Sequence, residues 1–292
     1  MPTAWPDSTF TMSSSPAATI APLGTFERKI AWVSSDLAVA EVRSIGEQIA
    51  VVAGRKPGTC IVTAASDKAK RSCAVTVTDS TLPAGWSYDE LSAPPIPGAV
   101  ALTDGKFTLT GCGHAMNAFW QRVKDQGVFI SKSVTGDVEI SARLTGLAPN
   151  VGGPNAYQWD NRPATASGLM IRESLTEGCS RYLLIQVEAS GQIVCRWRDK
   201  SGDQDGGKKK ELGKVTLPVH LKLVRTGREI QVLASTDGQN WGAPLMSHTA
   251  AFEAGGRAGL FVCSGNTFAT TTAEFDSVRM GPAGSAGSTL ER

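Results

Sequence analysis

The sequence lacks the features of a membrane protein, a secreted precursor or a nucleic-acid-binding protein. It has no run of about 18 apolar residues, the length that a membrane-spanning helix needs. Its first residues, MPTAWPDSTFTMSSSP, contain no basic stretch followed by an apolar one, so we expect no secretory signal there. The 29 basic and 27 acidic residues leave a net charge of only +2, whereas nucleic-acid binding needs a concentrated basic face.

Cysteines are few, and their spacing excludes a common type of metal site. None of the six belongs to a Cys-x-x-Cys pair, which structural zinc sites use. Cys60 and Cys73 flank the segment IVTAASDKAKRS, and a hairpin centred near Ser66 and Asp67 would place them across from each other. They form either a disulfide or two small buried apolar positions. The sequence leaves open the pairing of Cys112, Cys179, Cys195 and Cys263.

Short β-strands are what the sequence does contain. The 31 glycines and 15 prolines separate stretches rich in Val, Ile, Thr and Phe in which apolar and polar residues alternate. In residues 138–145, VEISARLT, every second side chain is apolar, which is typical of a strand with one buried face. No helical pattern exceeds two turns. Many short strands separated by turns predict an all-β protein built as a sandwich or barrel.

Changes in composition divide the chain into two domains with loose ends. The strand CAVTVTD ends one unit near residue 79, and the proline-rich segment WSYDELSAPPIPG begins the next. We predict domains at residues 16–80 and 81–280. Residues 1–15 and 281–292 are expected to be a flexible arm and a flexible tail.

The first domain resembles the bacterial immunoglobulin-like group 2 family. The motifs that carry this resemblance are W-x-S-S-D-x-x-V-A-x-V, starting at Trp32, and G-T-C-I-V-T-A, starting at Gly58. The resemblance covers roughly residues 25–79 and implies a spacer or adhesive module. We interpret Trp32 as a core residue and Asp36 as a turn residue.

The second domain resembles the concanavalin-A-like lectin/glucanase superfamily, in the bacterial group called regulation-of-enolase-like. The motifs are M-I-R-E-S from Met170, S-x-D-G-x-x-W from Ser235 and F-D-x-V-R from Phe275. The resemblance covers nearly the whole domain and implies a jelly-roll-like sandwich of two antiparallel sheets with one concave face. We interpret Asp237 and Gly238 as a hairpin turn and Trp241 as packing against it.

Ligand-binding candidates come from a long polar segment and from the strands. LAPNVGGPNAYQWDNRPATA, at residues 147–166, is longer than the resemblance implies, and it sets two aromatics among charges and amides. Such platforms hold sugar rings, although the favoured alternative is that the segment packs its own aromatics as a compact loop. Trp197 and Arg198 are neighbours on a strand, so only one of them can point to the concave face. The candidates for ligand binding are Trp120, Tyr157, Trp159, Asp160, Arg162, Arg172, Gln186 and Arg198.

The catalytic pattern of the glucanases is incomplete. Glucanases of this superfamily carry E-x-D-x-x-E, which places paired carboxylates on one strand face. The only predicted strand segment that begins this pattern with E-x-D is Glu274-Phe275-Asp276, and Arg279 occupies the position of the third acid. No histidine lies in a nucleophile motif. We therefore predict a protein without catalytic residues.

The loop before the basic run Lys208–Lys210 has two interpretations. Asp203 and Asp205, among glycines, could offer oxygen ligands to calcium, but the full D-x-D-x-D-G loop is missing. A plain hairpin tip is the favoured interpretation, and we expect no cofactor.

Together these observations predict a non-catalytic display protein, with an immunoglobulin-like spacer carrying a lectin-like head. It would act outside the cell, as a cell-surface adhesin or as a phage decoration or appendage protein, depending on whether Met1 is the native start. The expected partners are a glycan or another surface protein, with capsid or tail proteins and self-association as further alternatives. A glycoside hydrolase or its accessory module is the first alternative function, and a purely structural assembly protein is the second.

Overall fold

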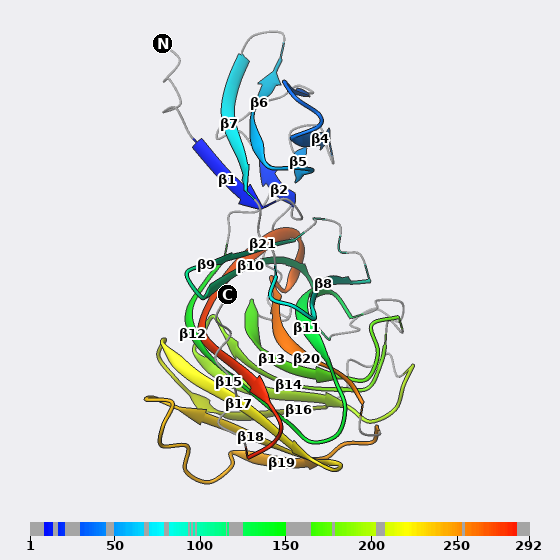
Figure 1. Ribbon diagram of the computed structural model, residues 1–292, viewed down its shortest axis with the longest axis vertical. Coiled ribbons are helices and arrows are strands. Elements are labelled where there is room, and N and C mark those ends of the chain that lie inside the picture. Colours follow the sequence, from blue (N-terminus) through cyan, green and yellow to red (C-terminus); the bar gives the residue numbers. More distant parts are fainter. Residues whose placement is uncertain are drawn as a thin grey trace.

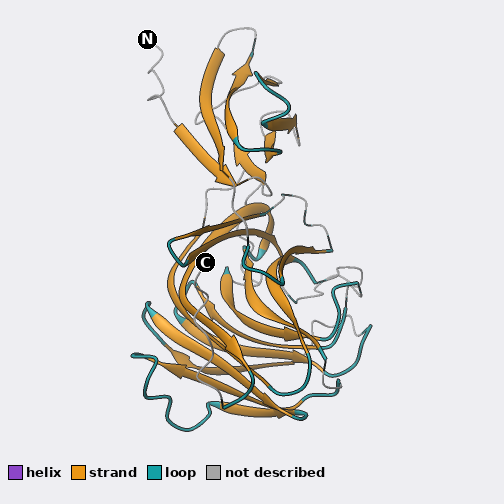
Figure 2. Ribbon diagram, viewed as in Figure 1, coloured by secondary structure: helices purple, strands orange, loops and turns teal. Residues whose placement is uncertain are grey.

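The protein is all-β in the computed structural model, as the sequence predicted. The structure describes residues 9–13, 17–20, 30–44, 50–66, 70–78, 82–92, 94, 96, 98–114, 116, 125–149, 165–176, 179–202, 208–252 and 255–284. Strands and loops account for all of these residues (Figure 2). In this described part of the chain, no helix is long and apolar enough to cross a membrane.

Residues 9–78 form two small sheets (Figure 1). The first has the strand order β1 (Thr9–Ser13), β7 (Lys70–Thr78), β6 (Gly58–Ala65) and β3 (Ala31–Ser34). The second has the order β2 (Ala17–Ile20), β5 (Ala50–Gly54) and β4 (Ala40–Ser44). Both sheets contribute to one cluster of buried residues, against which Trp32 packs. The kinship of this unit with immunoglobulin-like domains stays a prediction.

The two cysteines of this unit lie in a hairpin, but they are not opposite each other. Strand β6 pairs with β7 so that Cys60 faces Val75 and Cys73 faces Val62. The two thiols are therefore diagonal neighbours, farther apart than the Cβ separation of about 4 Å that a disulfide requires. Both are thiols in the structure, so the predicted disulfide is wrong. Cys60 is instead a buried member of the small core.

Residues 86–281 form a sandwich of two seven-stranded sheets. The β12 sheet has the order β19 (Met246–Thr249), β18 (Glu229–Ser235), β17 (Val219–Thr226), β12 (Val138–Pro149), β21 (Asn266–Gly281), β10 (Lys106–Gly113) and β9 (Ala99–Thr103). The β14 sheet has the order β16 (Lys208–Lys214), β15 (Gln192–Arg198), β14 (Tyr182–Glu188), β13 (Ala166–Arg172), β20 (Gly256–Cys263), β11 (Gly127–Val134) and β8 (Trp86–Leu91). All pairings between neighbouring strands in both sheets are antiparallel.

The main core lies between these sheets and follows the alternation of the strands. In β12, Val138, Ile140, Ala142 and Leu144 are buried in this core. The residues between them, such as Ser141 and Arg143, belong to the opposite face of the β12 sheet, which is partly exposed. The predicted sandwich and its inward residues are confirmed.

The central strands of the β14 sheet are buried on both faces. Strands β13 and β14 have almost continuous buried runs, ASGLMIR and YLLIQVE, which do not alternate. Their second set of side chains, including Met170, Tyr182 and Leu184, joins Met116 and Phe129 in a separate apolar cluster. Since both faces are covered, the continuous apolar runs are explained by burial rather than by helix formation.

Candidate functional site

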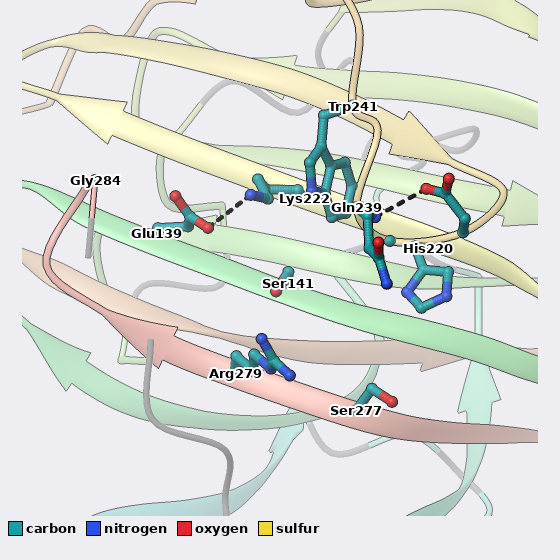
Figure 3. A pocket seen from close by; sticks show the side chains of 11 residues that line it. Glu139, Ser141, His220, Lys222, Gln239, Trp241, Ser277, Arg279 and Gly284 are labelled. Carbon is teal, nitrogen blue, oxygen red and sulfur yellow. Dashed lines mark hydrogen bonds and ion pairs between the residues drawn. The ribbon is translucent and has the colours of Figure 1, made fainter. Parts of the chain in front are cut away.

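A cavity of about 570 Å³ lies on the polar face of the β12 sheet (Figure 3). Strands β12, β17 and β21 supply its floor, and the loop after β18 supplies Trp241 and its neighbours. The lining residues are Glu139, Ser141, His220, Lys222, Asp237, Gly238, Gln239, Trp241, Ser277, Arg279 and Gly284.

The S-x-D-G-x-x-W motif builds one wall of this cavity. The Ser235 hydroxyl accepts hydrogen bonds from the backbone N–H groups of Asp237 and Gly238, which closes the turn. Gly238 has a φ of +70°, and a Cβ there would lie 2.5 Å from His220 Nδ1. Glycine is therefore required both for the turn and for its close approach to β17. The hairpin turn predicted at Asp237-Gly238 is confirmed, and it carries Trp241 to the cavity.

The F-D-x-V-R motif builds the floor through a β-bulge. Arg279 pairs with Ser141, and Asp276 pairs with Arg143. Between these two pairs the chain advances three residues in β21 but only two in β12, so β21 contains one extra residue. Ser277 takes up the extra length with a left-handed φ of +51°. Without a bulge, residues 276 and 279 would point to opposite faces. With it, Asp276 meets Arg143 on the polar face and Arg279 lines the cavity, while Val278 stays buried in the core.

Substitutions at Ser277 test the left-handed backbone conformation that the bulge requires. Ser277→Val should lower the free energy of unfolding by about 1–2 kcal/mol, because a β-branched residue is strained in the left-handed region. Ser277→Gly should change it by less than about 1 kcal/mol, since glycine adopts this conformation readily. Urea unfolding of both variants measures the difference. Equal losses in the two variants would show that the backbone at Ser277 is not left-handed.

An ion pair lies against an aromatic ring in the cavity. The Lys222 ammonium lies 2.7 Å from a Glu139 carboxylate oxygen and 4.3 Å from the centroid of the Trp241 ring. The His220 ring meets the same indole edge-on, with the centroids 6.5 Å apart. Figure 3 shows Trp241 beside Lys222, with Glu139, Ser141 and Arg279 on the neighbouring strands. The indole is half-buried, and its position is fixed by contacts with two strand residues.

The carboxylates whose pKa values are shifted are held ionised. Hydrogen bonds from the backbone of Asn240 and Gln239 strongly lower the pKa of Asp237. A hydrogen bond from Arg143 lowers the pKa of Asp276. Burial, and then the charge of Arg143, lowers the pKa of His220, which favours the neutral ring. A general acid needs a raised carboxyl pKa, so neither aspartate suits that role.

The acids of the incomplete glucanase pattern are engaged in ion pairs. Glu274 lies 2.7 Å from the Lys106 ammonium, and Asp276 is bound by the Arg143 guanidinium. Phe275 between them is fully buried in the core. Both acids lie on the polar face of the β12 sheet, as the alternation predicted, but each is neutralised by a basic neighbour.

Three predicted site residues lie on the β14 sheet, away from the cavity. Arg172 and Arg198 meet at the Asp125 carboxylate, with N–O distances of 2.6 and 2.7 Å to the same oxygen. All three side chains are at most 2% exposed. Gln186 is buried on the same face. The prediction that these residues form a concave ligand surface is therefore wrong for the arginines, which are buried in an ion cluster.

The choice between Trp197 and Arg198 is settled by their directions. Trp197 packs against the main core and contacts His248, with ring centroids 5.2 Å apart and the rings tilted by 43°. Arg198 points to the other face of the β14 sheet, toward Asp125. Of this pair, Trp197 is the one that faces the core.

The remaining predicted ligand and metal residues fall outside the part of the chain that the structure describes. They are Trp120, Tyr157, Trp159, Asp160, Arg162, Asp203 and Asp205. Their roles stay predictions. Among the described residues, no three His, Cys, Asp or Glu side chains gather as metal ligands do.

Sequence reasoning identified both motifs of the cavity but interpreted them as structural. Each motif ends in a side chain suited to binding, Trp241 in one and Arg279 in the other. This shared ending is the sequence feature that could have indicated a binding site. The sequence around Glu139 and Lys222 contains no comparable feature, because a charged residue on the polar side of a strand usually faces solvent.

Comparison with a solved structure at a TM-score of 0.50 supports the fold. No protein-family model matches the sequence, and no curated protein is similar to it. A Saccharomyces cerevisiae protein described as functionally unknown is 13% identical, with a TM-score of 0.50 over 69% of this chain and 98% of its own. A legume lectin-like domain from Entamoeba histolytica is 10% identical, with a TM-score of 0.41 over 68% and 90%. The GH43 protein BlXynB from Bacillus licheniformis, as a K247S mutant, is 14% identical, with a TM-score of 0.42 over 77% and 50%.

These similarities concern the fold of the two-sheet sandwich alone. At such identities, a shared fold does not transfer an activity or a ligand. Membership of the regulation-of-enolase-like group stays a prediction.

Proposed function

We propose that residues 81–280 form a carbohydrate-binding domain without catalytic activity, and that the cavity around Trp241 is its site. The single observation that carries this proposal is the convergence of an indole with several hydrogen-bonding side chains in one open cavity. Sugar rings stack their C–H faces on aromatic rings while their hydroxyls bond to polar groups at the edge. Trp241 supplies the first kind of contact, and Gln239, His220 and Ser141 supply the second.

The electrostatics of the cavity favour binding over hydrolysis. A retaining glycosidase needs two carboxyl groups about 5 Å apart, one of which is protonated before the reaction. In this cavity Asp237 is held ionised by its own turn, and Glu139 is bound to Lys222. Neither carboxylate is therefore free to act as the acid of a hydrolysis.

The proposed function also includes a display role. In this proposal the smaller unit is a spacer, and the larger one carries the ligand-binding face away from the surface to which the protein is attached. The setting would be extracellular, on a cell as an adhesin or on a virion as a decoration or appendage protein. Capsid or tail proteins would then be the partners of attachment.

Loss of glycan binding in a Trp241→Ala variant is the expected result that tests this function. Losing the stacking contact should weaken binding at least tenfold, which corresponds to about 1.4 kcal/mol. A glycan array identifies the ligand, and calorimetry measures the affinity. Leu245→Ala is the matched control, because Leu245 is an exposed apolar residue of the same connection that does not line the cavity.

Trp159→Ala separates this site from the one that the sequence predicted. Binding that survives Trp241→Ala and is lost in Trp159→Ala would move the site to residues 147–166. Glycan hydrolysis that a single Asp or Glu substitution abolishes would refute the non-catalytic assignment. Circular dichroism of each variant confirms that the loss is not caused by unfolding.

A further inference from the structure

We propose that the ligand of the Trp241 cavity carries an anionic group, a carboxylate or sulfate of an acidic sugar, and that Arg279 binds it. This inference rests on the proposed function and specifies its ligand class. It follows from an imbalance in the cavity: the carboxylates already accept hydrogen bonds from the protein, whereas one cation has no acidic partner among the residues that the structure describes.

The acceptors of the cavity are largely occupied. Asp237 Oδ1 accepts hydrogen bonds from the backbone N–H groups of Gln239 and Asn240, each at 2.8 Å, and from the Ser235 hydroxyl at 2.9 Å. Its Oδ2 accepts one from the Asn240 side-chain amide at 2.7 Å. Glu139 Oε1 is bound to Lys222. The two carboxylates are therefore poorly placed to receive the hydroxyl donors of a neutral sugar.

Arg279 is the cation with no countercharge. It is exposed, and no acidic side chain in the described part of the chain forms an ion pair with it. The neighbouring bases described on this face, Arg143, Lys222 and Lys106, are each paired with an acid. A guanidinium offers five N–H donors in a planar fork that fits a carboxylate or sulfate in two-point contact.

The surroundings of Arg279 favour an anion over a neutral acceptor. The bulge at Ser277 places Arg279 opposite Ser141, whose hydroxyl adds a further donor. Trp241 lies in the same cavity and would pack against the ring of the sugar that bears the acid group (Figure 3). An arginine on a half-open cavity floor interacts more strongly with an anion than one in open water, because the local dielectric is lower.

His220 gives this proposal an independent readout. The charged groups that act on it are Arg143, Asp276, Asp237 and Arg279, and burial together with the arginines lowers its pKa. A bound anion would raise that pKa again, so the protonated ring and the anion support each other. Binding should therefore strengthen as the pH falls toward the lowered pKa that His220 has in the free protein. His220→Gln should remove this pH dependence.

The experiment compares glycans that differ only in charge. The probes are a β-1,4-linked oligoglucuronate, its carboxyl-reduced form, which is the glucose oligomer of equal length, and the O-sulfated form of that oligomer. Calorimetry is run on the full chain at low and at 0.5 M salt, together with an array of paired acidic and neutral glycans. We expect the preferred glycans to be acidic and to bind at least tenfold more tightly than their neutral counterparts, with the difference reduced at high salt.

Variants at one position then separate charge from packing. Arg279→Gln should remove the preference for acidic glycans, and Arg279→Lys should keep part of it, because lysine retains the charge and loses the planar fork. Lys106→Gln is the control, since it removes one positive charge from the same sheet outside the cavity. It should leave the preference unchanged.

The outcomes distinguish this inference from the function on which it rests. Preference for neutral glycans, or an acidic preference that Arg279→Gln leaves intact, overturns the role of Arg279, while loss of binding in Trp241→Ala still upholds a glycan site. No binding to any glycan by the folded protein overturns both. Preference for the oligoglucuronate or for the sulfated oligomer identifies which acid group is recognised.

Discussion

Asp125→Asn is expected to lower the free energy of unfolding by about 3–5 kcal/mol, one of the two largest effects that we predict, because it leaves buried arginines without a countercharge. Arg198 contacts both oxygens of Asp125, at 2.7 and 2.8 Å, and Arg172 contacts one at 2.6 Å. None of these side chains is more than 2% exposed, so water cannot replace the lost charge. Denaturant unfolding measures the effect.

Asp276→Asn is the matched control for this prediction. Asp276 also binds an arginine, Arg143, but its side chain is 26% exposed and that of Arg143 is 40% exposed. The control should cost less than about 1 kcal/mol, because solvent screens exposed ion pairs. A triple variant with Leu at position 125 and Met at 172 and 198 should recover much of the stability lost in Asp125→Asn. Equal losses at Asp125 and Asp276 would contradict the burial of the cluster.

Gly168→Ala is expected to destabilise the protein by about 3 kcal/mol or more. A Cβ at position 168 would clash with the Ile185 carbonyl oxygen and would lie 2.8 Å from the Cα of Gln186. These are backbone atoms of the neighbouring strand β14, so the clash can be relieved only by moving the sheet. Circular dichroism during thermal unfolding would show a lowered Tm.

Gly255→Ala provides the control for Gly168. No atom lies within 4 Å of the position that its Cβ would take, so the added methyl group meets open space. Its stability should stay within about 0.5 kcal/mol of the parent protein. A Gly168→Ala variant as stable as Gly255→Ala would show that strands β13 and β14 are not as close as described.

Local pattern predicted the fold well because strand alternation is a local property. The alternating residues of β12 identified its buried face correctly, and the Asp237-Gly238 turn was read from the dipeptide alone. The same rule failed at Arg172 and Arg198. Alternation gives the face on which a side chain lies, but not what covers that face. Met116 and Asp125, from a distant segment, pack against this face of the β14 sheet.

The candidate cavity required information that no single segment contains. Ser141 and Arg279 are opposite each other only through the pairing of β12 with β21, and Arg279 shares a face with Asp276 only because of the bulge at Ser277. One inserted residue reverses the direction of every side chain beyond it. A sequence pattern of period two cannot reveal such an insertion unless the partner strand is known.

The sequence by itself determined that this protein is all-β, which faces of its regular strands are apolar and where its tight turns lie, because each of these depends on neighbouring residues. Only the tertiary structure decided that Trp241, Lys222, Glu139 and Arg279 meet in one cavity, and that Arg172 and Arg198 are buried against Asp125. The physical reason is that cross-strand register and the covering of a sheet face are set by contacts between segments that are far apart along the chain.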